Sequence, residues 1–172
     1  MLSEDIVREV VLSVLGRTQQ YFQDEIGVAL TEVGQESGTV DLLELRCLTA
    51  IVALGGEINL LIAFSFDSCL TDPVYTSLTA DIDVPDDEQD LYRCEAVAEL
   101  VNTIIGNCTA DFQRPDQRIS LSPPVVIQDA KRIQRSRNSV FNRLRLQSRL
   151  GNLDINFVGP VELFDKRLNY VK

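Results

Sequence analysis

Apolar residues recur at helical spacing in two long stretches of the chain. The first runs from Ser3 to about Val33, with Ser3 as its expected cap and a break expected near Gly27. The second runs from about Asp87 to Phe112 and follows acidic residues that suit the positive end of a helix dipole. A weaker helical pattern lies between Asp67 and Thr79, where Pro73 must sit in the first turn or between two helical pieces. The pattern therefore predicts three helices.

Short apolar runs bounded by turn residues predict strands. The strongest signal is a hairpin, because the runs 47–54 and 58–66 flank the glycine pair Gly55 and Gly56. The remaining expected segments are a turn at 34–38, a strand at 40–45, a strand at 119–127 and a second hairpin of 140–150 with 153–158. Its turn is placed at Gly151 and Asn152, and Pro123 and Pro124 place the strand 119–127 at a bulge or an edge.

The order of these elements predicts the fold class. No internal repeat and no low-complexity linker interrupts the chain. Residues 1–172 are therefore expected to form one α/β (α+β) domain, in which long helices pack on a mostly antiparallel sheet.

Composition removes several kinds of chemistry. The chain has no histidine, so mechanisms that need an imidazole base are excluded. Four cysteines, Cys47, Cys69, Cys94 and Cys108, are widely spaced and form no CxxC pair. We expect no metal site and interpret all four cysteines as small buried apolar residues.

The charge is unevenly distributed. Residues 1–130 carry 6 basic and 23 acidic side chains within a total net charge of −10, which should repel nucleic acid. A basic run without any Asp or Glu follows and consists of Lys131, Arg132, Arg135, Arg137, Arg143, Arg145 and Arg149. Two interpretations stay open for this run, a solvated edge strand protected by charge and a docking surface for an acidic partner protein.

No apolar run is long enough for a membrane span. The chain starts with Met1, Leu2, Ser3, Glu4 and Asp5, which is acidic where a signal peptide would be basic. We therefore expect a cytoplasmic protein.

The helix expected at 87–112 has two different faces. A step of 100° per residue places one set on a continuous core face: Cys94, Val97, Ala98, Val101, Ile104, Ile105 and Cys108. The opposite face carries Glu95, Glu99, Asn102, Gly106 and Thr109. An ordinary solvated face is one interpretation. Against it, Glu95 and Glu99 are like charges one turn apart, and Gly106 costs about 1 kcal/mol relative to Ala inside a helix.

The residues on this polar face also carry a family resemblance. The segment 99–107, ELVNTIIGN, resembles the ExxN helix of the CheX/CheC/FliY family of chemotaxis phosphatases. The glycine-centred hairpin at 50–66 and the proline-containing strand at 119–126 stand where the family has them. Since the N-terminal helix has no second ExxN motif, the chain looks like the CheX type. The resemblance implies a CheC-like fold over residues 5–158.

The resemblance also implies an activity, hydrolysis of the aspartyl phosphate on a CheY-like response regulator. In that reaction Asn102 would position the attacking water and Glu99 would pair with the receiver's active-site lysine. Glu95, Thr103 and Gly106 would contact the partner. No cofactor of its own is implied, since Mg²⁺ belongs to the regulator, and relatives of this type suggest a possible homodimer.

Two other functions remain open. A non-catalytic CheX-like module could bind a receiver domain or a motility component, because Glu95 adds negative charge beside an anionic transition state. The motif could also be a coincidence in an ordinary α/β interaction domain. Burial of Glu99 and Asn102 in a core would contradict both receiver-binding hypotheses.

Overall fold

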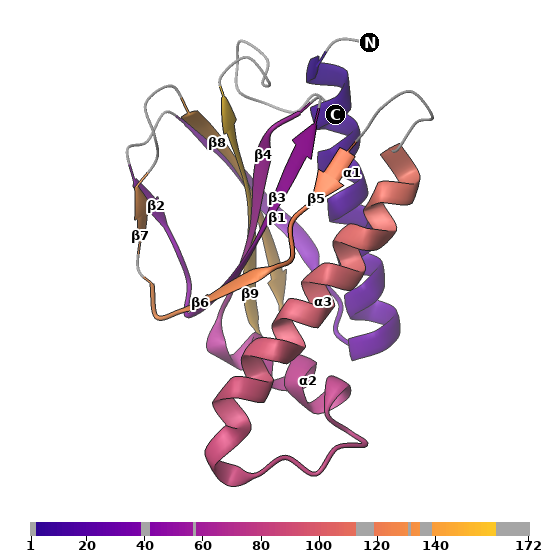
Figure 1. Ribbon diagram of the computed structural model, residues 1–172, viewed down its shortest axis with the longest axis vertical. Helices are drawn as coiled ribbons and strands as arrows, with labels where there is room; N and C mark the ends of the chain where they lie inside the picture. Colours follow the sequence, from indigo (N-terminus) through magenta and orange to yellow (C-terminus); the bar gives the residue numbers. More distant parts are fainter. Residues whose placement is uncertain are drawn as a thin grey trace.

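Three α-helices form close to the predicted positions in the computed structural model of the chain (Figure 1). The structure describes residues 3–38, 42–56, 58–112, 119–130, 132–134 and 139–160. The helices are α1 (Ser3–Tyr21), α2 (Ser68–Leu78) and α3 (Gln89–Phe112). A π-helical turn, η1 (Phe22–Ile26), extends α1, and a 3-10 turn, η2 (Asp86–Glu88), precedes α3.

The strands are β1 (Thr31–Gly38), β2 (Leu42–Glu44), β3 (Leu48–Gly56), β4 (Leu60–Phe66), β5 (Ile119–Leu121), β6 (Val125–Gln128), β7 (Arg132–Gln134), β8 (Ser139–Ser148) and β9 (Gly151–Pro160). Seven of them form one sheet in the order β1-β8-β9-β4-β3-β5, and β6 also pairs with β3. β2 and β7 form a separate two-stranded ribbon. Every pairing between described strands is antiparallel, which confirms the predicted fold class.

Helices α1 and α3 lie side by side over one face of the sheet, with α2 near one end of it (Figure 1). Alternate residues of the central strands point toward these helices, as a pleated strand requires. Phe64 and Phe66 of β4 and Phe157 of β9 are fully buried there, together with Leu100 and Ile104 of α3. The apolar face of the motif helix is thus fixed against the sheet near β3 and β6 and against α1.

The first helix is shorter than predicted. Its π-helical extension ends at Ile26 and is capped by Gly27, which adopts a left-handed conformation with φ of 73° and donates its N–H to the carbonyl of Phe22. The predicted break is therefore an end, and the expected turn at 34–38 is instead part of strand β1. Leu30 follows Ile26 at helical spacing, but like Val28 it is buried from a connecting segment beyond the break. Pairing with β8 decides the structure of the following residues.

Two smaller predictions also need correction. Helix α2 is continuous and Pro73 lies within it, beyond the first turn. The carbonyl that loses a hydrogen bond belongs to Cys69, a solvent-exposed residue, which limits the cost. In the second hairpin Ser148 pairs with Gly151, so the turn residues are Arg149 and Leu150 rather than Gly151 and Asn152.

The glycine-centred hairpin and the proline-containing strand follow the prediction. β3 and β4 pair from Leu48 with Phe66 to Leu54 with Leu60, and Glu57 lies outside the described residues. β5 and β6 pair with the same side of β3 at two successive places. Pro123 and Pro124 stand between them, so the two short strands take the edge position that proline allows.

The interpretation of all four cysteines as buried is wrong. Cys108 is buried and Cys94 is half-buried, but Cys47 and Cys69 are exposed. Cys47 precedes β3 and Cys69 lies in the first turn of α2, and at both places the chain meets solvent. The small size of cysteine suits either environment, so spacing alone could not distinguish them.

The edge-strand interpretation of the basic run is wrong for β8, whereas β7 is one of the two strands of the β2–β7 ribbon and does have a free edge among the described strands. β8 lies between β1 and β9, and Arg143 on it is buried. Arg132 and Arg149 are exposed, whereas Lys131, Arg135 and Arg137 lie outside the described residues. The arginines of β8 have carboxylate partners on neighbouring strands, which explains how an interior strand accommodates them.

Candidate functional site

The exposed face of α3 carries the residues that the sequence singled out. Glu95, Glu99, Asn102 and Gly106 are exposed, while Thr103 is half-buried. On the opposite side the predicted core face is buried at Val97, Val101, Ile104, Ile105 and Cys108, with Cys94 and Ala98 half-buried. Glu99 and Asn102 are three residues apart, so both side chains project from neighbouring points of one helix surface. Burial of Glu99 and Asn102 would have contradicted both receiver-binding hypotheses, and the structure exposes both residues.

Glu99 lies close to the end of α1. The hydroxyl of Thr103 donates a hydrogen bond to Glu99 Oε1 at 3.4 Å, which is long for such a contact. Burial raises the pKa of Tyr21 at the end of α1, and the carboxylates of Glu25 and Glu99 add to the rise. No cation lies within ion-pair distance of Glu99 in the described part of the chain. Its carboxylate is therefore available to a positive group from outside.

Gly106 leaves an open place on the same face. A Cβ added there would meet no heavy atom within 4 Å, so the fold of this chain does not require a glycine. Thr109 donates its hydroxyl to the carbonyl of Gly106 at 2.6 Å, which keeps that side chain close to the helix. No side chain therefore projects from position 106, and the helix surface one turn after Asn102 is open.

Polar contacts hold α3 near both ends. Near its C-terminal end, Asp111 accepts hydrogen bonds from Ser13 Oγ at 2.6 Å and Arg17 Nε at 2.9 Å, both on α1. These two donors lower the pKa of Asp111 to about 2. Near the N-terminal end, Arg93 pairs with Asp72 of α2 and lies 5.1 Å from the ring centroid of Tyr75. Sequence analysis missed these contacts, because nothing in the spacing of charged residues links helices far apart in the chain.

The described residues contain no cluster of Cys, Asp or Glu that could hold a metal ion. The thiol of Cys108, on the buried side of α3, has its pKa raised to about 11 by burial. It is therefore a protonated core residue at neutral pH, not a nucleophile. On the polar face of α3, Glu99 and Asn102 offer a carboxylate and an amide three residues apart, a pair that can bind a cation and orient a water molecule.

Comparison with known families identifies the family of this chain. The family described as "Chemotaxis phosphatase CheX" matches residues 48–142, a segment that begins at β3 and contains α3 whole. The chain belongs to the CheX family. The match also covers both prolines of the edge strand, which confirms the resemblance drawn from the motif and its surroundings. No curated protein sequence matches the chain.

Solved structures of CheX and related proteins share the fold. A CheX protein from Desulfovibrio desulfuricans superimposes with a TM-score of 0.72 at 19% identity, covering 87% of this chain and 97% of that one. The CheX of a CheX–CheY–BeF3–Mg²⁺ complex from Borrelia burgdorferi gives 0.60 at 16% identity, with coverages of 87% and 96%. FliY from Thermotoga maritima gives 0.60 at 14% identity, with coverages of 98% and 94%. At these identities the likeness concerns the fold.

Within the described ranges, no helix combines the length and the apolar character needed to cross a bilayer.

Proposed function

We propose that this CheX-family chain hydrolyses the aspartyl phosphate of a CheY-like response regulator and uses α3 as the inserted helix. The observation that carries the proposal is the joint exposure of Glu99 and Asn102 on one surface of a helix that is otherwise fixed in the core. The CheX of the Borrelia burgdorferi complex is bound to CheY with BeF3 and Mg²⁺, which supports a receiver as the partner.

The chemistry demands little from the catalyst. An acyl phosphate has a carboxylate leaving group of low pKa, so attack by water in line needs mainly positioning and charge stabilisation. The Asn102 amide accepts a hydrogen bond from the water through Oδ1 and donates one through Nδ2, without any titrating group. The water oxygen forms the new bond to phosphorus while the bond to the aspartyl oxygen breaks, and the water proton passes to the released phosphate or solvent.

Glu99 has a docking role in this proposal. Its carboxylate has no cation of its own among the described residues, and an ion pair with the receiver's active-site lysine would fix the helix in register. Mg²⁺ is supplied by the regulator, so this chain needs no cofactor. Thr103 lies one turn from Glu99 on the same helix, and Gly106 leaves room for the receiver backbone to approach.

Glu95 motivates the second candidate, a non-catalytic CheX-like module. It is exposed one turn before Glu99, so a docked receiver would meet two carboxylates in a row. A second negative charge beside an anionic transition state disfavours turnover more than it disfavours binding. Binding without hydrolysis is therefore the outcome that distinguishes this candidate.

The test compares turnover with binding. Phosphate release from a phosphorylated cognate regulator is measured for wild type, Asn102→Ala and Asn107→Ala. Asn107 is also exposed on α3 and serves as the matched control. We expect Asn102→Ala to lose roughly 100-fold in turnover, since mispositioned reactants cost about that much, and Asn107→Ala to keep the wild-type rate. Equal rates for wild type and Asn102→Ala would contradict the catalytic role.

Binding to the regulator activated with BeF3 and Mg²⁺ completes the test. Asn102→Ala should bind as wild type does, because it acts on the water, whereas Glu99→Gln should bind more weakly. A wild type that binds the activated regulator without accelerating dephosphorylation would establish the non-catalytic module instead.

A further inference from the structure

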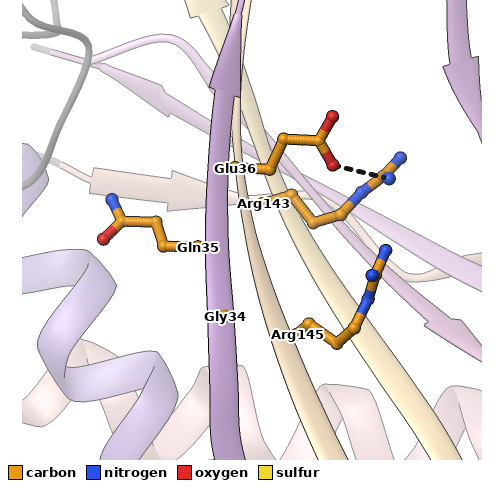
Figure 2. Close-up of a pocket in the computed structure, with 5 residues that line it drawn as sticks. All are labelled: Gly34, Gln35, Glu36, Arg143 and Arg145. Atoms are coloured by element: carbon orange, nitrogen blue, oxygen red, sulfur yellow. Dashed lines mark hydrogen bonds and ion pairs between the residues drawn. The ribbon is translucent and has the colours of Figure 1, made fainter.

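A small hollow lies between β1 and β8, on the sheet face that points away from α1 and α3. It has a volume of about 80 Å³ and is lined by Gly34, Gln35, Glu36, Arg143 and Arg145. Arg143 and Arg145 are two residues apart on β8, so their side chains leave the same face of the strand and lie side by side (Figure 2). The Gln35 side chain points to the other side of β1 (Figure 2).

The register between β1 and β8 gives the two arginines different neighbours. Arg143 stands opposite Glu36, and Glu36 Oε2 accepts a hydrogen bond from Arg143 Nη1 at 3.3 Å. Arg145 stands opposite Gly34, where β1 has no side chain and an added Cβ would meet nothing within 4 Å. Arg143 therefore faces a carboxylate on β1, whereas Arg145 faces the open hollow.

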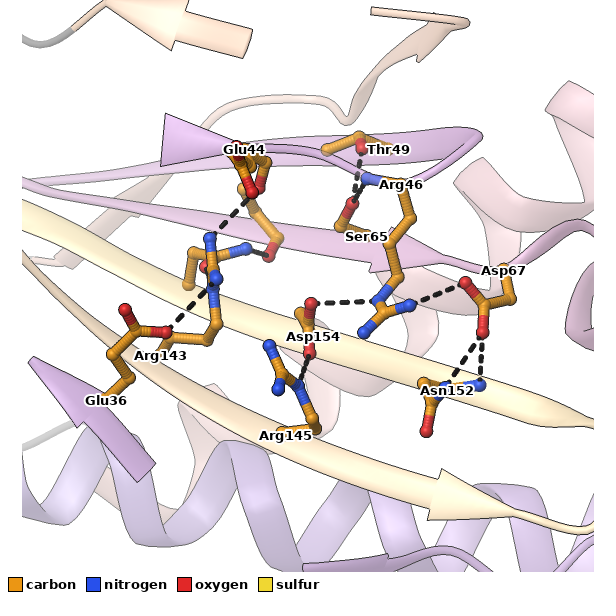
Figure 3. A network of polar contacts seen from close by, with 12 residues as sticks. Glu36, Glu44, Arg46, Thr49, Ser65, Asp67, Arg143, Arg145, Asn152 and Asp154 are labelled. Atoms are coloured by element: carbon orange, nitrogen blue, oxygen red, sulfur yellow. Dashed lines mark hydrogen bonds and ion pairs between the residues drawn. The ribbon is translucent and has the colours of Figure 1, made fainter. Parts of the chain in front are cut away.

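The guanidinium of Arg145 is only partly satisfied. Its Nε donates to Asp154 Oδ1 at 3.1 Å, while the other oxygen of Asp154 is taken by Arg46 Nε at 2.8 Å. Figure 3 shows how this nearly buried carboxylate is shared by two guanidinium groups. Arg46 has a second carboxylate, Asp67, at 2.6 Å. No described residue accepts a hydrogen bond from the two Nη atoms of Arg145, whose side chain is 45% exposed.

Arg143 supplies a fixed positive charge beside this opening. Its Nε donates to Asn156 Oδ1 at 2.9 Å and its Nη2 to the Glu44 carbonyl at 3.0 Å, and the residue is buried. Glu36, its carboxylate partner, is held by one long contact and its side chain is 57% exposed. The guanidinium of Arg143 is therefore held in place, whereas the exposed Glu36 side chain can adopt other rotamers.

We propose that this hollow binds a small oxyanion, a phosphate or carboxylate group, through the two Nη atoms of Arg145. A guanidinium presents parallel N–H donors that match two oxygens of such a group. A hollow of about 80 Å³ has room for one such group. The site lies on the opposite face of the sheet from Glu99 and Asn102, so it is independent of the proposed phosphatase activity.

The test uses inorganic phosphate and acetate as separate probes, each compared with chloride at equal ionic strength. Backbone amide NMR signals of Gly34 and Glu36 should shift saturably with at least one probe. The more effective probe identifies the source of the oxyanion. Arg145→Gln should weaken that affinity at least tenfold, whereas Arg149→Gln, which removes an exposed arginine from the nearby turn, should leave it unchanged.

A second variant places a carboxylate in the site permanently. Gly34→Asp should abolish the response to both probes and raise the melting temperature without them, because the new carboxylate faces Arg145. The backbone at Gly34 has no positive φ, so an aspartate fits there. The proposal is overturned if neither probe gives a saturable response, if Arg145→Gln binds like wild type, or if Gly34→Asp still binds the probe.

Discussion

Substitutions of Gly106 should affect the stability of the fold and the docking of a receiver differently. Glycine in a helix interior costs about 1 kcal/mol relative to alanine, and a Cβ at this position meets no heavy atom within 4 Å. Gly106→Ala should therefore stabilise the protein by about 0.5–1 kcal/mol, a rise in melting temperature of about 1–4 °C for a chain of this size. Thermal or urea unfolding measures this gain.

A large side chain at position 106 should weaken docking. Gly106→Leu also folds, because the surrounding space is open, but its side chain would hold a receiver away from Glu99 and Asn102. We expect turnover of the phosphorylated regulator to fall more than about tenfold, equivalent to about 1.4 kcal/mol of lost interaction. Thr76→Leu adds an exposed leucine to α2 and controls for a general effect of surface hydrophobicity.

One result would refute this reasoning. If Gly106→Leu folds and still dephosphorylates the regulator at the wild-type rate, the receiver does not approach this part of α3. Loss of activity in both leucine variants would attribute the effect to surface hydrophobicity and not to the docking face.

Two further predictions concern charge and thiol chemistry. Asp111, with a folded pKa of about 2 against about 4 in an unfolded chain, contributes stability above pH 4 that is lost as the pH falls through 2. Urea unfolding between pH 5 and 2 should show a steeper loss for wild type than for Asp111→Asn, and parallel curves would contradict the ion pair with Arg17. In thiol labelling of the native protein, Cys47 and Cys69 should react first and Cys108 only after unfolding. Mass spectrometry identifies the labelled sites, and rapid labelling of Cys108 would contradict its burial.

The sequence predicted the elements whose pattern is long or strongly marked. Helix α3 repeats its apolar spacing over several turns, and the glycine pair at 55 and 56 marks the end of β3 before the chain returns as β4. β1 was missed because its residues are mostly exposed and polar, and only pairing with β8 makes them a strand. The position of β8 inside the sheet was missed for a related reason, since carboxylates from other strands compensate its arginines.

The candidate site was predictable because it lies on one continuous helix. Periodicity alone placed Glu99 and Asn102 on the face opposite Val101, and the structure exposes both. Their roles remain a proposal. The contacts that position the helix, such as Asp111 with Arg17, join residues far apart in the sequence, and single-sequence patterns carry no information on such pairs.

The prolines between β5 and β6 make the two edges of the sheet unequal. On one side β3 is covered by two short strands that Pro123 and Pro124 separate, so no long row of backbone donors faces outward there. On the other side β1 pairs, among the described strands, with β8 alone. Among the described strands of this sheet, β1 therefore offers the longer run of unpaired backbone groups at an edge. Edge-to-edge association through β1 would bury that edge in both copies, and the short strands β5 and β6 would offer a further copy less backbone to pair with.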